Sequence, residues 1–163
     1  MDKSNFEKVI DFNKQFGITL HEKPILNIFD IDPKLIQYRM SLVREEMREL
    51  EDGVLQKNYK ETIDALGDLL YVIYGFSASI GTNMDSAFDI IHQSNMSKLC
   101  NTEEEAIKTV EFYIQNKEKL GYDSPAYRKS FDGKYFVVYN QSSCKVLKSI
   151  NYKEVDFTSL LNQ

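Results

Sequence analysis

Hydrophobic residues recur every three or four positions from the start of the chain to about residue 118, which is the spacing of amphipathic helices. The predicted helices cover residues 2–16, 33–52, 61–81, 84–99 and 103–118. In the third of these, apolar side chains between Leu69 and Phe76 point all round the helix axis, and no formal charge follows Asp68 until Asp85. This pattern is typical of a buried helix and predicts that it forms the centre of a helical bundle.

Local signals mark where two of these helices begin. Asp32 followed by Pro33 supplies a cap and a first-turn proline for the second helix. Thr102 caps the last helix, whose first turn holds three glutamates that suit the positive end of the helix dipole. Between residues 18 and 32 the helical pattern breaks, which predicts a crossing loop. The apolar anchors expected in this loop are Ile25, Ile28 and Phe29.

Two helices carry a clear apolar stripe. The stripe on the second helix consists of Ile36, Met40, Val43, Met47, Leu50 and Val54. The stripe on the fourth helix consists of Met84, Phe88 and Ile91. Its next position is Asn95, and Lys98 follows one turn later, so two polar residues are predicted to continue a buried face. Each also has a structural explanation, because a buried asparagine can serve as a local hydrogen-bonding group and a lysine near a helix end complements the dipole.

The period changes from helix to strand in the last third of the chain. Residues 121–130 are expected to form a loop, whereas residues 134–139 and 145–148 alternate as two strands joined by a short turn. The expected fold class is mainly α, an antiparallel helical bundle with a small C-terminal β-hairpin. A single domain is expected, with a four-helix core over residues 1–99 and an appended helix, hairpin and tail over residues 100–163.

Acidic residues lie at spacings of three and four on two of the helices, which places them on one face of each. They are Glu45, Glu46 and Glu49 on the second helix and Glu61, Asp64 and Asp68 on the third. A helical hairpin across the short link from Gly53 to Asn58 places the two sets opposite each other. Ionised carboxylates buried without partners are costly, so a cation is expected between them. Oxygen ligands of this kind suit a hard divalent ion such as Mg²⁺.

The same acids have a second interpretation as charges on solvated helix surfaces. Glu-Glu-x-x-Glu patterns are common on exposed helices, where Arg44, Arg48 or Lys60 can form weak surface pairs with them. For Asp64 and Asp68 the metal interpretation is favoured, because their helix is otherwise apolar and offers little solvated surface.

Composition and charge narrow the possible functions. The net charge of −5 argues against a nucleic-acid partner. Cys100 and Cys144 lie far apart without metal-binding spacing, so reduced thiols in a cytoplasmic protein are expected. The first residues lack the apolar segment of a signal peptide, and the apolar run from Leu69 to Met84 is shorter than the ~20 residues of a membrane span. No membrane partner is therefore expected.

The motifs together resemble the all-α NTP pyrophosphatase superfamily, which contains MazG, dimeric dUTPases and phosphoribosyl-ATP pyrophosphohydrolase. The resemblance rests on EExxE at Glu45–Glu49, ExxD at Glu61–Asp64 continuing as DALGDLLYVIYG, and SNMSKL at Ser94–Leu99. VIDFNKQFG near the start and KVLKSINYK near the end extend it over most of the chain. The similarity is greatest to the MazG-like branch labelled phosphoribosyl-ATP pyrophosphohydrolase-like.

This resemblance implies a helical bundle that forms a homodimer or tetramer. It also implies Mg²⁺- or Mn²⁺-dependent hydrolysis of a nucleoside triphosphate to the monophosphate and pyrophosphate. The implied metal ligands are Glu46, Glu49, Glu61 and Asp64, with Glu45 and Asp68 as further ligand or water-positioning groups. The implied nucleotide contacts are Asn95 and Lys98, which match an NxxK motif. A carboxylate that the metal does not fully occupy, Glu45 or Glu46, would accept a proton from the attacking water.

One position departs from the MazG pattern. Many MazG proteins carry EExGD as the second motif, which would place a ligand on Ala65. Because alanine cannot coordinate a metal, Glu61 and Asp64 are favoured as the ligand pair, and Asp68 has no fixed role.

Three functions follow from these observations. The leading hypothesis is a nucleotide pyrophosphohydrolase that acts on NTPs or dNTPs, with dUTP or non-canonical nucleotides as house-cleaning substrates. The second is hydrolysis of phosphoribosyl-ATP. The third is a non-catalytic helical oligomer whose acids form a structural cation site or a surface network.

Overall fold

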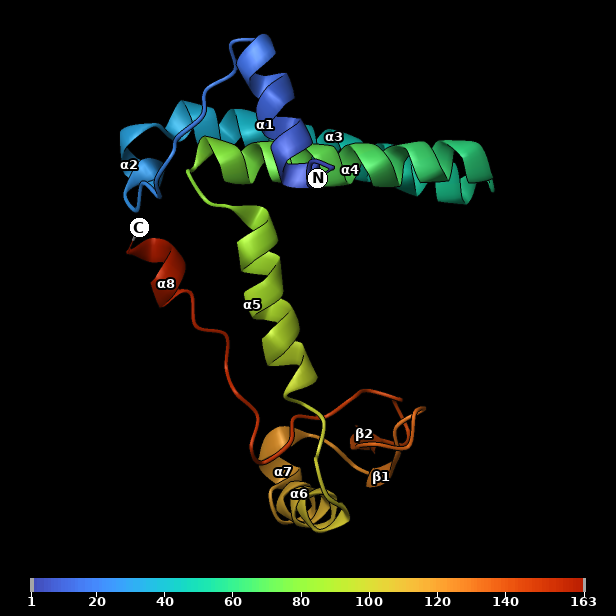
Figure 1. Cartoon of the computed structure of the whole chain (residues 1–163). Coiled ribbons are helices and arrows are strands. Elements are labelled where there is room, and N and C mark those ends of the chain that lie inside the picture. The colour runs from blue at the N-terminus through green and yellow to red at the C-terminus, as the bar shows by residue number, and fades with distance from the viewer. Residues whose placement is uncertain (1, 163) are drawn as a thin grey trace. The chain divides into compact units, whose positions relative to one another are not determined.

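The structure, a computed structural model, describes residues 2–162 (Figure 1). Its helices are α1 (Asn5–Gln15), α2 (Ile28–Ile31), α3 (Pro33–Leu55), α4 (Tyr59–Ser79), α5 (Met84–Met96), α6 (Glu103–Gln115), α7 (Lys117–Leu120) and α8 (Thr158–Leu161). Its strands are β1 (Pro125–Lys129) and β2 (Phe136–Asn140), which pair antiparallel. The predicted fold class, mainly α with a small C-terminal sheet, is confirmed.

The described chain divides into two compact units. The first unit contains residues 2–88 and also residues 157–162, whereas the second contains residues 89–156. Helix α5 contributes residues to both units, because the division follows Phe88. The first unit is therefore discontinuous in sequence.

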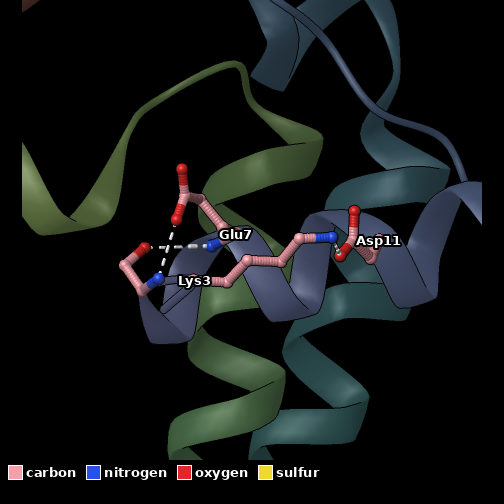
Figure 2. Close-up of polar contacts among 4 residues, drawn as sticks. Lys3, Glu7 and Asp11 are labelled. Carbon is pink, nitrogen blue, oxygen red and sulfur yellow. Dashed lines mark hydrogen bonds and ion pairs between the residues drawn. The ribbon is translucent and has the colours of Figure 1, made fainter. Parts of the chain in front are cut away.

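Helix α1 begins with a complete capping box. The Ser4 hydroxyl accepts a hydrogen bond from the Glu7 backbone N–H at 3.2 Å, and the Glu7 carboxylate accepts one from the Ser4 N–H at 2.7 Å. Figure 2 shows these bonds beside the exposed ion pair between Lys3 and Asp11. Two otherwise unpaired backbone donors are thereby satisfied, which fixes the start of the helix. The buried residues of α1 are Phe6, Val9 and Asn13.

The loop before α3 contains a short helix that the sequence pattern did not predict. Successive side chains of this short helix, α2, lie about 100° apart around its axis, so neighbouring residues face different directions. Ile28 is buried as predicted, but Phe29 is exposed, so its predicted role as an anchor is wrong. The predicted start of α3 is confirmed, since the Asp32 carboxylate accepts a hydrogen bond from the Leu35 N–H at 3.0 Å and Pro33 opens the helix.

Helices α3 and α4 pack against each other as an antiparallel hairpin in the first unit (Figure 1). The Asn58 side chain caps α4 by accepting a hydrogen bond from the Glu61 N–H at 3.4 Å. The two helices come closest near the turn, where a Cβ atom at Gly53 would lie 3.0 Å from the backbone nitrogen of Thr62. The predicted hairpin between the two acidic helices is therefore present.

The end of α4 is in close contact with the loop that follows α1. Gly81 has a φ of +80°, and a Cβ atom there would lie only 1.9 Å from the carbonyl oxygen of Lys23. The Ile25 N–H donates a hydrogen bond to the Ile80 carbonyl at 3.2 Å. Only glycine satisfies both the positive φ and the close approach at residue 81. The loop is thus fixed to the C-terminal end of α4.

The prediction that α4 is buried all round is wrong for a single chain. Its fully buried positions carry small side chains, namely Ala65, Gly75, Ser77, Ala78 and Ser79. Large apolar residues between them, such as Leu70 with 56% of its surface exposed, face outward. The same holds for Met47 and Val54 of the predicted α3 stripe, which are exposed. Helices α1 and α3 pack on the side of α4 that carries its small residues, and the larger apolar residues of α4 stay exposed.

The second unit has its own core around α6. The core residues are Cys100, Ala106, Tyr113, Val138 and Leu147. Thr102 caps α6 as predicted, since its hydroxyl accepts a hydrogen bond from the Glu105 N–H at 3.1 Å. Three large apolar residues of α6, namely Ile107, Phe112 and Ile114, are exposed. Thr109 is buried instead, with its hydroxyl bonded to the Glu105 carbonyl at 2.8 Å.

The sheet pairs different segments from those predicted. Strand β2 lies within the predicted strand region, but its partner is β1, which precedes it and had been assigned to a loop. Residues 145–147 also pair with β2, as predicted, through an isolated antiparallel bridge between Tyr139 and Val146 and backbone hydrogen bonds from Asn140 N to Lys145 O and from Leu147 N to Val138 O, both at 2.9 Å. The turn after β2 is occupied by side-chain hydrogen bonds: the Asn140 amide donates to Asp123 at 2.9 Å and to Ser142 at 2.9 Å. These bonds tie the end of β2 to the residue before Ser124 and to the turn at residues 141–143.

Cys100 is buried, Cys144 is exposed, and both are free thiols, as predicted. Across residues 2–162, no helix taken alone has the length and apolar character needed to cross a membrane. Helices α4 and α5 meet that test only as a pair, across a break where they are bent by 107°.

Candidate active site

The six predicted acids lie along the contact between α3 and α4. Glu49, Glu61 and Asp64 line one cavity of about 400 Å³ near the hairpin turn. Glu46, one turn before Glu49, is close enough to Asp64 and Asp68 on α4 for their charges to act on it. Glu45 also acts on Glu46 from its own helix. The structure therefore brings all six residues into one acidic seam, the name used below for these six side chains.

Glu46 has the most unfavourable environment in the acidic seam. Burial raises the pKa of its carboxyl group above the ordinary value, and the neighbouring charges raise it further. The charges come from Glu49, Asp68, Glu45 and Asp64. The Glu46 Oε2 atom is buried and has no hydrogen-bond partner within the described residues. Because buried acceptors are nearly always satisfied, this oxygen marks a place where a cation or a donor is missing from the protein itself.

Among residues 2–162, no lysine, arginine or histidine forms an ion pair with a residue of the acidic seam. The ion pairs found there join Lys3 to Asp11, Lys108 to Glu104 and Lys134 to Asp132, and none involves a seam residue. The surface pairs with Arg44, Arg48 or Lys60 that would explain the acids as a solvated network are thus not formed.

The donor set fits a hard divalent cation, but the ligands are not assembled around one point. Within the part of the chain that the structure describes, no three His, Cys, Asp or Glu side chains converge closely enough to hold a metal ion. Carboxylate oxygens are the ligands such ions take, and the unpartnered Glu46 oxygen supplies a fixed starting point. Binding would therefore require rotation of seam side chains, which the exposed positions of Glu49, Glu61 and Asp64 permit.

Asn95 and Lys98 lie together in the second unit. The Lys98 ammonium donates a hydrogen bond to the Asn95 side-chain oxygen at 2.7 Å. The prediction that Asn95 continues a buried stripe of α5 is wrong, because Phe88 and Ile91 of that stripe are exposed, as is Asn95, whereas Ser94 is buried. The Ser94 hydroxyl donates to the Lys153 carbonyl at 2.8 Å and bonds the Tyr152 hydroxyl at 2.9 Å. Asn95 and Lys98 are consequently free to meet a ligand from solvent.

Arg39 is a residue of the first unit whose importance the sequence pattern did not reveal. It is 4% exposed, lies with its guanidinium carbon 5.8 Å from the centroid of the Tyr38 ring, and burial lowers its pKa. Its Nε and Nη2 atoms have no partner within residues 2–162, and neither has the Asn13 amide nitrogen. The space for the guanidinium is provided by Gly75, where a Cβ atom would lie 3.4 Å from Nη1. The sequence did contain one signal for Arg39. It precedes Glu46 by seven residues, which places both side chains on one face of α3, two turns apart.

Known proteins resemble this chain over the residues that carry the acidic seam. A family model described as phosphoribosyl-ATP pyrophosphohydrolase matches residues 9–95, which is more than half of the chain. The match includes every residue of the acidic seam and ends at Asn95. An uncharacterized protein of Acanthamoeba polyphaga mimivirus, L479, is 28% identical over 243 aligned residues, which cover 97% of this chain and 96% of that protein. Because this alignment is longer than the present chain, the viral protein carries insertions relative to it.

Proposed function

Because this chain belongs to the phosphoribosyl-ATP pyrophosphohydrolase family, within the MazG-like all-α NTP pyrophosphatases, we propose that it hydrolyses nucleoside triphosphates with Mg²⁺ or Mn²⁺. The products are a nucleoside monophosphate and pyrophosphate, from an NTP or a dNTP. The observation that carries the proposal is the unpartnered Glu46 oxygen inside a seam of six acids that no lysine or arginine neutralises.

The metal ligands that we propose are Glu46, Glu49, Glu61, Asp64 and Asp68. Of these, Glu46 provides the buried oxygen, and Glu49, Glu61 and Asp64 share the cavity beside the hairpin turn. A metal ion held by these residues would neutralise charge on the phosphate oxygens around the phosphorus atom that water attacks. Asp68 completes the set from the α4 side, because its charge acts directly on Glu46.

The chain's own groups position and deprotonate the water. Glu45 or Glu46 accepts a proton from the water whose oxygen attacks phosphorus, and the P–O bond to the departing pyrophosphate breaks. Asn95 and Lys98 hold the nucleotide through an amide and an ammonium, which suit its polar and phosphate groups.

We also propose that a second copy of the chain covers the outward face of α3 and α4. Leu55, Tyr59, Ile63 and Leu70 are all exposed on this hairpin. A run of large apolar side chains on paired helices is more typical of a protein–protein contact than of a free surface. Size-exclusion chromatography with light scattering would give a homodimer or tetramer, and a monomer at micromolar concentration would contradict the proposal.

Phosphoribosyl-ATP is the second candidate substrate, because the matched family takes its description from that reaction. The same seam would serve it, since the bond broken is again a phosphoric anhydride. The two candidates differ in the group attached to the base, which the acidic seam does not contact.

The deciding experiment measures pyrophosphate release from a panel of NTPs, dNTPs and phosphoribosyl-ATP with Mg²⁺, Mn²⁺ or EDTA. Turnover that requires metal is expected. Glu49→Gln and Asp64→Asn should lower kcat/KM by about 100-fold or more, since each removes a ligand oxygen charge. Glu51→Gln is the matched control, because Glu51 is an exposed acid on α3 outside the seam. Full activity in both seam variants, or release that ignores EDTA, would contradict the proposal.

A further inference from the structure

The second unit contains a pocket whose chemistry differs from that of the acidic seam. Its volume is about 830 Å³, and almost all of its wall lies beyond the residues matched by the family. Lysines and aromatic residues dominate the lining, chiefly Lys98, Phe112, Tyr122, Lys145, Lys148 and Tyr152. Pockets of this size hold small-molecule ligands in other proteins. We name it the lysine–tyrosine pocket.

The aromatic wall of this pocket is held rigidly by Tyr113. The Tyr113 hydroxyl donates a hydrogen bond to the Lys148 carbonyl and accepts one from the Lys148 N–H, both at 3.1 Å. Its ring packs edge-on against Phe112 at 5.4 Å and against Tyr122 at 5.5 Å between centroids. Tyr113 is buried and doubly bonded, so it supports the two rings that pack against it.

Positive charge is concentrated on this wall and is not neutralised by acids. The Lys145 ammonium lies 5.2 Å from the centroid of the Tyr122 ring, and the Lys148 ammonium lies 4.2 Å from that of Tyr152. Neither lysine, nor Lys98, takes part in an ion pair within residues 2–162. The second unit holds ten basic and ten acidic residues, so its overall charge does not account for this concentration. One acid, Glu154, lies on the pocket rim.

We propose that the lysine–tyrosine pocket binds a nucleotide, with its phosphates on Lys98, Lys145 and Lys148 and its base against the aromatic wall. Ammonium groups are phosphate ligands, and aromatic faces stack on any base. Acidic carboxylates are not required, so the pocket binds nucleotide without a divalent metal. The inference rests on the proposed function only through Lys98, which that function also uses.

Binding of ATP to the full chain in EDTA, measured by calorimetry, tests this proposal. A Lys145→Gln, Lys148→Gln variant should bind ATP at least tenfold more weakly than the wild type. The matched control is Lys117→Gln, Lys119→Gln, which removes two exposed lysines from α7 in the same unit and should leave the affinity unchanged. Equal ATP binding by both double variants, or no binding by the wild type, would overturn the proposal. Thermal unfolding of each variant confirms that it is folded.

Two further probes separate the parts of the ligand and the two sites. Inorganic pyrophosphate should bind more weakly than ATP, because it lacks a base; equal affinity would overturn the role of the aromatic wall. Glu49→Gln should retain ATP binding in EDTA while losing pyrophosphate release, so failure of the hydrolysis proposal does not imply failure of this one.

Discussion

Replacement of Gly81 by alanine is expected to destabilise the first unit far more than the same change at Gly17. Both glycines have a positive φ, +80° at Gly81 and +65° at Gly17, so both substitutions force alanine into the left-handed region. This conformation costs alanine about 1–2 kcal/mol. At Gly17 a Cβ atom meets nothing within 4 Å, so the backbone cost is the whole effect.

At Gly81 the new methyl group also displaces a neighbouring loop. The Lys23 carbonyl oxygen would lie 1.9 Å from the added Cβ, and an ordinary contact begins at 3.4 Å, so the loop must retreat by about 1.5 Å. Three hydrogen bonds join this loop to the end of α4: His21 N to Ala78 O at 3.1 Å, Ile25 N to Ile80 O at 3.2 Å and Ser79 Oγ to Thr19 O at 2.9 Å. Their loss costs about 1 kcal/mol each. Gly81→Ala should therefore cost about 4–5 kcal/mol in total, roughly 3 kcal/mol more than Gly17→Ala.

Urea unfolding followed by circular dichroism measures the two free energies, and hydrogen exchange locates the damage. The amide protons of His21 and Ile25 should lose protection in Gly81→Ala and keep it in Gly17→Ala. If the two variants differ by less than about 1 kcal/mol, the loop does not lie on Gly81 as the structure describes it.

Four other predictions rest on glycine contacts, a shifted pKa and a buried hydroxyl group. Gly67→Ala should stabilise α4 by about 0.5–1 kcal/mol, since its Cβ meets open space. Gly53→Ala should not give this stabilisation, because its Cβ would lie 3.0 Å from the α4 backbone. It should also lower catalytic activity, since the contact would push α3 and α4 apart and separate the acids of the seam. Hydrogen bonds from Ser142, Asn140 and Ser124 lower the pKa of Asp123 to about 2, below its ordinary 3.8. Its contribution to stability is thus complete above pH 3.8 and is lost as the pH falls through about 2; a carboxyl NMR titration with its midpoint near 3.8 would contradict this. Tyr113→Phe should cost about 1–3 kcal/mol in thermal or urea unfolding, since it removes both hydrogen bonds between the buried Tyr113 hydroxyl and the Lys148 backbone; an unchanged midpoint would contradict a stabilising role for these two bonds.

The features predicted correctly from sequence are those that depend on a few neighbouring residues. The cap and proline at Asp32 and Pro33, and the cap at Thr102, act within one helical turn, so their signals are complete in the sequence. The spacing of the acids on α3 and α4 is also local, and the short turn between these helices leaves one simple way to pair them.

The features that were missed depend on which segments meet in space. Alternation predicted β2, but it does not state whether the partner precedes or follows, and the side-chain bonds of Asn140 favour β1. The burial of Arg39 depends on the room left by Gly75, a residue of another helix. Similarly, α4 carries apolar residues on every side, which indicates that these residues favour burial. The pattern does not state whether they are buried by the same chain or by another one.

The discontinuity of the first unit has a consequence for synthesis of the protein on the ribosome. Residues 157–162, which include the buried Leu160, belong with residues 2–88 but are made after the whole of residues 89–156. At ordinary translation speed this interval lasts roughly 3 to 14 s, far longer than a helical hairpin needs to form. Residues 2–88 must therefore fold without the last segment of their unit while the second unit is translated. Chaperones at the exit tunnel would meet this intermediate before α8 is available to join it.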